Sequence, residues 1–93
     1  MNLMEPKFTL GKTYATAAVA AWAERLGIDL TRYLLRHHCG QWGDLEEDDK
    51  RANEYALTDG TRIFSAYLIE GAKIYIITEA DRSHTTILFA AEY

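Results

Sequence analysis

The chain reads RIFSAYLIEGAKIYIIT over residues 62–78. Residues 62–68 and 73–78 are rich in Ile, Tyr and Phe and flank the pair Glu70-Gly71, a pattern that is typical of an antiparallel β-hairpin. A third run of this kind, residues 85–89, follows a polar loop. The sequence therefore predicts a three-stranded antiparallel meander in the C-terminal part of the chain.

Two helices are expected upstream of the meander. Thr16 is placed to cap a first helix, whose alanine-rich apolar stripe ends at Gly27. Asp29 is placed to cap a second helix, which ends at Gly40. The short connection between them predicts a closely packed helix pair.

A third helix is expected at the acidic run of residues 44–49. Asp44 and Glu47 match the N-cap and N3 positions of a capping box, and residues 58–60 are expected to end the helix. Glu46 with Lys50 and Glu47 with Arg51 form i, i+4 pairs of the favourable orientation. Most of the acidic run thus has a structural explanation, because negative side chains are favourable in the first turn of a helix.

These elements predict one α+β domain over residues 1–93. Residues 7–14 are expected to form an N-terminal strand, followed by the three helices and then by the three-stranded antiparallel meander. Packing the helices on one face of the sheet buries one apolar side of each layer. A chain of 93 residues has room for one hydrophobic core, as a monomer or a small homo-oligomer.

Composition narrows the function classes. With 48% hydrophobic and 26% charged residues the chain is typical of a globular protein, and it lacks an apolar run of membrane-spanning length. Residues 1–7 do not resemble a signal peptide, so a cytoplasmic location is expected and no membrane partner. The single cysteine, Cys39, cannot form an internal disulfide. A net charge of −4 disfavours direct nucleic-acid binding.

Several polar residues suggest phosphate chemistry. A metal-independent ribonuclease needs a general base, a general acid and a cation that stabilises the phosphorane, together with hydroxyls that bind the phosphate. Residue types suited to these roles are His37, Arg62, Arg82, His84 and Thr86, with His38 and Thr85 beside them. The alternative is that the loop of residues 78–86 is only a hairpin connection, in which Asp81 and Ser83 satisfy local backbone groups and Arg82 pairs with a nearby acid.

No metal or cofactor is expected. His37 and His38 are adjacent, so on a helix they point about 100° apart and do not chelate one ion easily. The chain also lacks the glycine-rich nucleotide loops and the nucleophile-elbow motif.

Aromatic residues allow two interpretations. Phe64, Tyr67 and Tyr75 with the two tryptophans are numerous enough for base stacking, but strands that cover a core favour packing instead. Trp42 lies between two helices beside Gly40 and Gly43, where it can anchor either its own loop or a partner.

Two segments, RHHCGQWG (residues 36–43) and IITEADRSHTT (residues 76–86), carry a resemblance. The chain resembles a family of small uncharacterised proteins carried on plasmids and integrated elements of proteobacteria, some of which are labelled as restriction-modification subunits. This chain is too short for a methyltransferase domain and lacks its glycine-rich loop, which argues against that label. In its order of elements it is also similar to the barnase and RelE-like ribonuclease superfamily, which implies roles for His37, Arg62, Arg82 and Thr86.

Two functional hypotheses follow. The first is a non-enzymatic inhibitor, borne on a plasmid or phage, that binds the basic surface of a host nucleic-acid-binding defence protein, of the anti-CRISPR or anti-restriction type. Its expected partner-binding residues are Trp42, Asp44, Glu46, Glu47, Asp49, Asp81 and Arg82. The second is a metal-independent ribonuclease or toxin. A structural or regulatory subunit without either activity is the third possibility.

Overall fold

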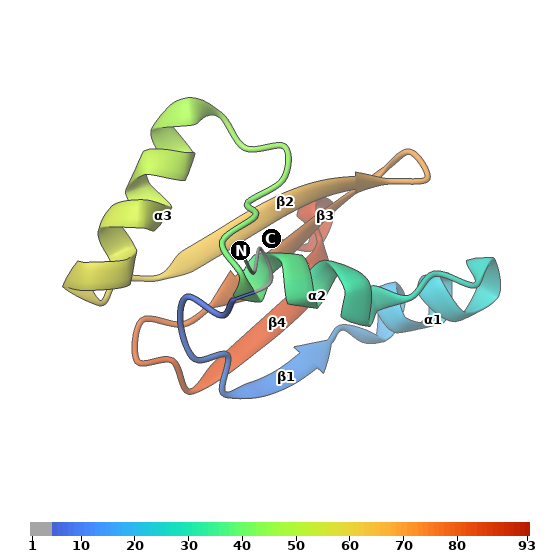
Figure 1. Ribbon diagram of the computed structural model, residues 1–93. Helices are drawn as coiled ribbons and strands as arrows, with labels where there is room; N and C mark the ends of the chain where they lie inside the picture. Colours follow the sequence, from blue (N-terminus) through green and yellow to red (C-terminus); the bar gives the residue numbers. More distant parts are fainter. Residues whose placement is uncertain (1–4) are drawn as a thin grey trace.

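The computed structural model describes residues 5–93 (Figure 1). Residues 1–4, on which the expectation about a signal peptide partly depends, lie outside the described part. The predicted α+β class is confirmed. In chain order the elements are β1 (Lys12–Ala15), α1 (Ala17–Leu26), α2 (Leu30–His38), α3 (Glu47–Asp59), β2 (Ile63–Ile69), β3 (Ala72–Thr78), β4 (His84–Phe89) and the short 3₁₀ helix η1 (Ala90–Glu92).

The sheet has the strand order β1-β4-β3-β2. The predicted hairpin is confirmed, because β2 and β3 pair antiparallel around a turn at Glu70 and Gly71, and β4 continues the meander. The stated strand layout was wrong in one respect: β1 joins the free edge of β4 in parallel, so the sheet is mixed. The backbone N–H of Lys12 donates to Ser83 at 3.1 Å and that of Thr16 to Ile87 at 3.0 Å.

The first strand is shorter than predicted, because only Lys12–Ala15 pair with β4. Gly11 precedes it at φ +67°, and a Cβ atom there would lie 2.3 Å from the carbonyl oxygen of Ser83. The chain before this close approach therefore leaves the sheet. There Phe8 packs its ring edge-on against His37, with centroids 5.1 Å apart.

The caps of the first two helices are confirmed. The Thr16 hydroxyl accepts the N–H of Val19 at 3.3 Å, and the Asp29 carboxylate accepts the N–H of Thr31 at 3.1 Å. Gly27 ends α1 in the left-handed conformation at φ +70°. Each cap depends on residues within three positions of it, and for that reason the sequence pattern was enough to predict the caps.

The predicted start of the third helix was wrong. α3 begins at Glu47, and Glu46 occupies the N-cap position without a side-chain cap. Asp44 instead serves the sheet: its backbone N–H donates to the Ala66 carbonyl at 2.6 Å, and its carboxylate accepts the N–H of Leu68 at 2.9 Å. Tertiary pairing with the edge of β2 thus replaces the local capping box.

The ion pairs within α3 also differ from the predicted i, i+4 spacing. Lys50 lies 3.7 Å from Glu47, and Arg51 pairs with Asp48, so both pairs are i, i+3. All four side chains are at least partly exposed.

The helices form two groups. Figure 1 shows α2 in front of the sheet and α1 at its right-hand end, and both pack against the main core of Val19, Tyr67, Ile69, Ile74, Ile76 and Ile87. α3 lies along the outer edge of β2, over a second cluster of Trp42, Ala56 and Ile63. The prediction that the helices pack on one face of the sheet therefore holds for α1 and α2, whereas α3 covers the outer edge of β2. None of the helices in residues 5–93 has the length and apolar character needed to cross a membrane.

Candidate functional site

A buried chain of polar side chains links α2 to the sheet. His37 is fully buried at the end of α2, and its Nδ1 atom lies 2.6 Å from the Ser65 hydroxyl on β2. Its Nε2 atom lies 2.9 Å from the Thr78 hydroxyl on β3. Thr78 in turn lies 2.7 Å from the hydroxyl of Thr85 on β4, which donates to the Leu10 carbonyl at 2.7 Å. The network therefore joins α2, all strands of the meander and the N-terminal lead.

The Leu10 carbonyl sets the direction of every hydrogen bond in this network. A carbonyl only accepts, so the single hydroxyl proton of Thr85 is used there and Thr85 must accept from Thr78. Thr78 then has no proton left for His37, so Nε2 carries the proton and donates. In the neutral imidazole, which burial favours, Nδ1 then accepts from Ser65, and the tautomer is the one with the proton on Nε2.

The electrostatics agree with this assignment. Desolvation by burial, with a smaller contribution from the neighbouring His38, lowers the pKa of His37 from 6.5 to about 3. Every buried side-chain nitrogen and oxygen in the described residues has a hydrogen-bond partner. His37 therefore has neither solvent access nor a free ring nitrogen with which to move a substrate proton.

The other ribonuclease candidates lie elsewhere. Strand residues alternate between the two faces, and Thr86 points opposite to its buried neighbour Thr85. His84 is on the Thr86 side, with its ring 6.1 Å from Tyr14 and its Nδ1 atom 3.0 Å from the Ser83 hydroxyl. Arg62 lies over the ring of Tyr93, with Cζ 5.4 Å from the centroid. The sheet separates this set from His37.

Arg82 is held as a structural link between the β3–β4 turn and α3. Its Nη2 atom donates to the Ala56 carbonyl in the last turn of α3 at 2.9 Å. Its Nη1 atom donates to Thr61 at 2.6 Å and to Glu79 and Ala80 at 3.2 Å each. A cation at the C-terminal end of a helix also interacts favourably with the helix dipole. The predicted pairing of Arg82 with a nearby acid is replaced by these carbonyl contacts, and the geometry does not support the ribonuclease hypothesis.

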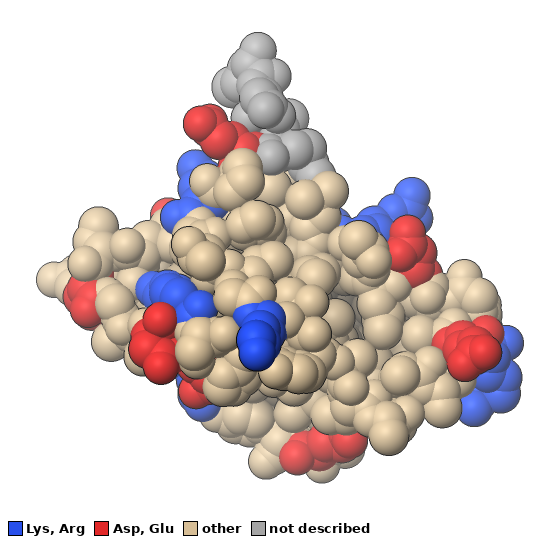
Figure 2. All heavy atoms as spheres, turned by 90° about the horizontal axis from the view of Figure 1, so that it is seen from below, with Lys and Arg blue, Asp and Glu red and all other residues tan. Residues whose placement is uncertain are grey.

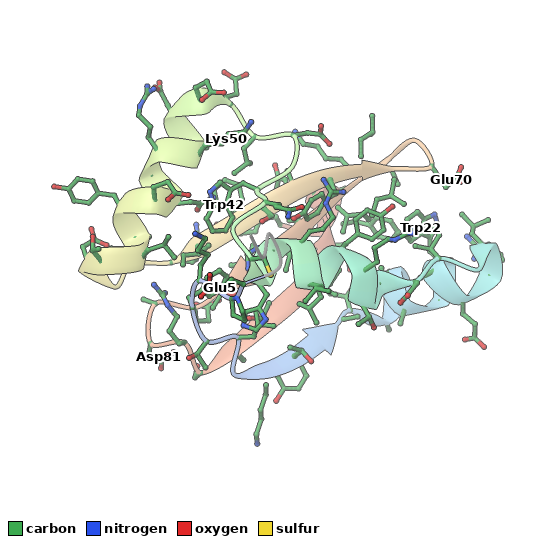
Figure 3. All side chains as sticks on the ribbon, viewed as in Figure 1. Glu5, Trp22, Trp42, Lys50, Glu70 and Asp81 are labelled. Atoms are coloured by element: carbon green, nitrogen blue, oxygen red, sulfur yellow. The ribbon has the colours of Figure 1, made fainter. Side chains whose placement is uncertain are left out.

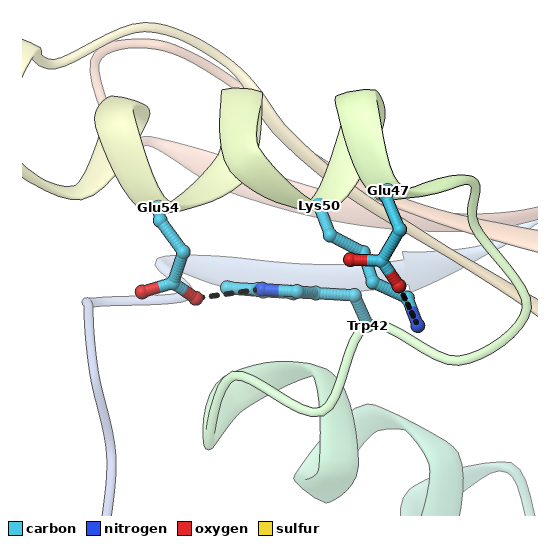
Figure 4. Close-up of polar contacts among 4 residues, drawn as sticks. All are labelled: Trp42, Glu47, Lys50 and Glu54. Carbon is cyan, nitrogen blue, oxygen red and sulfur yellow. Dashed lines mark hydrogen bonds and ion pairs between the residues drawn. The ribbon is translucent and has the colours of Figure 1, made fainter.

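Trp42 anchors its own loop. The side chain is buried, its ring stacks on Phe8 with centroids 6.1 Å apart, and its indole N–H donates to the Glu54 carboxylate at 2.8 Å. Figure 4 shows the indole beneath α3, with Glu54, Lys50 and Glu47 extending from the helix toward it. Of the predicted partner-binding residues, Trp42 and Asp44 are therefore committed to the fold, as Arg82 is.

Four acidic side chains at the start of α3 stay exposed. They are Glu46, Glu47, Asp48 and Asp49. Glu47 and Asp48 each have one basic neighbour on the helix, whereas within residues 5–93 the carboxylates of Glu46 and Asp49 take part in no hydrogen bond or ion pair.

Asp81 lies apart from these acids, in the turn between β3 and β4. Its carboxylate accepts the Ser83 N–H at 2.9 Å, and this bonding to Ser83 lowers the pKa of Asp81. The predicted local role of Asp81 is thus confirmed.

Sequence reasoning missed two features. Asn53 is buried on α3, where its amide donates to the Phe64 carbonyl at 2.6 Å and accepts the Phe64 N–H at 3.1 Å. The hydroxyls of Ser65 and Thr78 also escaped notice, and that of Thr85 was expected to bind a phosphate rather than a buried network. All three occupy core-facing strand positions, so the alternation of the strands was a signal that could have found them.

Residues 5–93 contain no group of three or more His, Cys, Asp or Glu side chains arranged to hold a metal ion. The pockets found are bordered by partly exposed side chains, and Figure 3 shows the side chains that project between the helices and the sheet. Comparison of the chain with protein-family models, curated proteins and solved structures finds no match.

Proposed function

We propose that this protein is a non-enzymatic inhibitor that binds the basic surface of a host nucleic-acid-binding defence protein. The observation that carries the proposal is the exposed acidic turn, which we define as Glu46, Glu47, Asp48 and Asp49 at the start of α3. The mobile-element setting, and with it the anti-CRISPR or anti-restriction role, rests on the resemblance to plasmid-borne proteins.

Among the described residues, two of the four carboxylates of the acidic turn are unpaired, and the other two are held only weakly. Its two ion pairs are short-range pairs on one exposed helix, a kind that contributes little energy and leaves the side chains free to rearrange. Glu46 and Asp49 have no described partner. The turn also stands outside the main body, because α3 lies along the edge of the sheet (Figure 1).

Such a turn suits competition with nucleic acid. Carboxylates spaced along one helical turn present negative charge to a cationic groove, where electrostatic attraction speeds association and favours the correct partner. The chemistry required of the partner is a surface rich in Arg and Lys that otherwise holds phosphates. The acids also stabilise the helix start, so the proposal needs a binding experiment.

The experiment compares two charge-reversed variants in cells with an active nucleic-acid-targeting defence. The first combines Glu46→Lys, Glu47→Lys and Asp49→Lys, and the control combines Glu5→Lys, Glu24→Lys and Glu70→Lys, which are exposed acids elsewhere in the chain. Expression of the wild type and of the control should raise the transformation efficiency of a targeted plasmid. The α3 reversal should abolish this protection while the protein stays folded by circular dichroism.

A physical readout accompanies the cellular one. The purified defence complex should bind the wild type and the control, more weakly as salt rises, and should then lose its own nucleic-acid binding. Equal binding by the α3 reversal and the wild type would overturn the proposal, as would a protein that protects no targeted plasmid.

A further inference from the structure

The face of the sheet opposite α1 and α2 carries side chains that the proposed function does not use. Alternation places Tyr14, Phe64, Tyr75, Ile77, Thr86 and Leu88 on this outward face. Within residues 5–93 no α-helix covers it. Only η1 and Tyr93 return toward it, and the Tyr93 ring meets the Tyr75 ring with centroids 5.9 Å apart.

Three aromatic rings form a row across this face. Phe64 and Tyr75 have centroids 5.8 Å apart, and Tyr93 continues the row beyond Tyr75. Together with Arg62 and Ile77 they line a pocket of about 140 Å³, and Tyr93 is 64% exposed beside it. Small-molecule sites usually begin at about 300 Å³, so this pocket suits one planar group rather than a whole cofactor.

Basic side chains flank the row. The Arg62 guanidinium lies 5.4 Å from the Tyr93 centroid, and the Lys73 ammonium lies 5.8 Å from the Tyr75 centroid. Lys12 adds a third exposed cation at an outward position of β1, and no outward strand position holds a carboxylate. The net charge of −4 describes the whole chain, whereas this face is locally positive.

We propose that this face binds single-stranded nucleic acid. One base stacks on the exposed ring of Tyr93 beside the pocket, and the adjoining phosphates are held by Arg62 and Lys73. A four-stranded sheet with helices on one side leaves the aromatic side chains of its other side accessible to unstacked bases. Paired bases are not accessible in this way, so the site favours single strands over duplexes. Because stacking uses the face that every base has, little sequence preference is expected.

The proposal concerns a surface separate from the acidic turn and does not depend on the proposed inhibitor role. The first test measures fluorescence anisotropy of labelled oligothymidylate and oligouridylate about ten nucleotides long, with a duplex of equal length as comparison. The full-length protein should bind the single strands and bind the duplex more weakly.

Two aromatic variants and one control locate the site. Tyr93→Ala and Tyr75→Ala should each weaken binding about tenfold, as expected for the loss of one base-stacking ring. Tyr55→Ala removes a tyrosine that is 72% exposed on α3, and should leave the affinity unchanged. Tyr93 is largely exposed, so Tyr93→Ala should fold and still test the site if Tyr75→Ala fails to fold.

The dependence of oligonucleotide affinity on salt tests whether Arg62 and Lys73 contact phosphates. For single strands the logarithm of the affinity falls with the logarithm of salt by about 0.7 per phosphate contact. Arg62→Gln and Lys73→Gln should each reduce that slope by about 0.7, whereas Arg25→Gln, an exposed change on α1, should not.

Three results would overturn the proposal. They are equal affinity of Tyr93→Ala and the wild type, binding of the duplex as tight as that of the single strand, and no binding of either oligonucleotide at micromolar protein. Sedimentation velocity runs alongside. If Tyr93→Ala abolished self-association and left oligonucleotide binding intact, the face would belong to a second copy of the chain instead.

Discussion

His37 connects α2 to the sheet through two buried hydrogen bonds, and the same burial should make the protein less stable in acid. Its folded pKa of about 3 lies below the value of 6.5 expected in the unfolded chain, so the unfolded state binds the extra proton. The free energy of unfolding should therefore be unaffected above pH 6.5 and fall as the pH drops from 6.5 toward 3, by about 1.4 kcal/mol per pH unit. The loss is on the order of 5 kcal/mol in all.

Urea unfolding at a series of pH values checks this expectation. His37→Gln should show a flatter dependence between pH 6.5 and 5, whatever its own stability, because the titrating group is gone. Leu35→Gln, an exposed change on the same helix that leaves His37 in place, should keep the wild-type slope. Parallel curves for wild type and His37→Gln would contradict the neutral, sealed imidazole.

Gly43 and Gly60 have nearly the same backbone conformation but different surroundings. Both have left-handed φ values, +78° and +77°, which cost an alanine about 1 kcal/mol. A Cβ atom at Gly43 would also lie 2.1 Å from the Ala66 carbonyl oxygen, whereas one at Gly60 meets nothing within 4 Å. Gly43→Ala should therefore destabilise at least about twice as much as Gly60→Ala in urea unfolding. Equal losses would show that conformation alone matters at Gly43.

At the scale of elements, three different kinds of contact satisfy the backbone groups on the outer edge of β2. The Asn53 amide pairs with both backbone groups of Phe64, the segment around Gly43 pairs with Ala66, and the Asp44 carboxylate accepts the N–H of Leu68. An open strand edge is a template for pairing with another chain. α3 and its leading loop therefore protect the sheet from edge-to-edge association.

Asn53→Ala should open this edge locally. It leaves the N–H and carbonyl of Phe64 without their partner, and should lower the free energy of unfolding by about 3 kcal/mol. Hydrogen exchange should accelerate at the Phe64 amide more than at Ile76, which lies in the central strand β3. Tyr55→Ala on the exposed side of the same helix should change neither measurement by much. Uniform acceleration across the sheet would show that Asn53 supports the whole fold rather than the edge.

An element could be predicted from the sequence when the interactions that specify it lie close together in the chain. The hairpin and the caps at Thr16 and Asp29 depend on neighbours in sequence, so pattern alone located them. The parallel pairing of β1 with β4 joins Lys12 to His84, and no local signal marks it. Asp44 matched a capping box but met a competing donor, the N–H of Leu68, that only the fold supplies.

The candidate site was harder to predict than the fold, for the same reason. Residue types suggested that His37 and Arg82 were reactive, yet burial and carbonyl partners commit both to structure. Phe64, Tyr67 and Tyr75 were all expected to favour packing. The alternation along β2 sends Tyr67 into the core and Phe64 to the outward face, where it joins Tyr75.

For the whole molecule, charge is distributed in small groups rather than in one field. Figure 2 shows, on the side seen from below, that acidic and basic side chains lie near one another around the rim and that the middle is mainly uncharged. The acidic turn at the start of α3 and the cations flanking the aromatic row belong to different elements. The two proposed surfaces are therefore separate, and the net charge is expected to modulate binding at both.

This arrangement predicts opposite effects of one variant on the two kinds of binding. Each change in Glu46→Lys, Glu47→Lys and Asp49→Lys adds two positive charges, so the triple reversal takes the net charge from −4 to +2. It should abolish binding to a basic protein surface and strengthen oligonucleotide binding several-fold at low salt, because the long-range repulsion of phosphates is removed. The gain should vanish near 1 M salt, where the screening length falls to about 3 Å. Anisotropy titrations of wild type and variant at both salt levels measure this. An oligonucleotide affinity that falls on reversal would mean that the acidic turn itself takes part in nucleic-acid binding, and the two surfaces would not be separate.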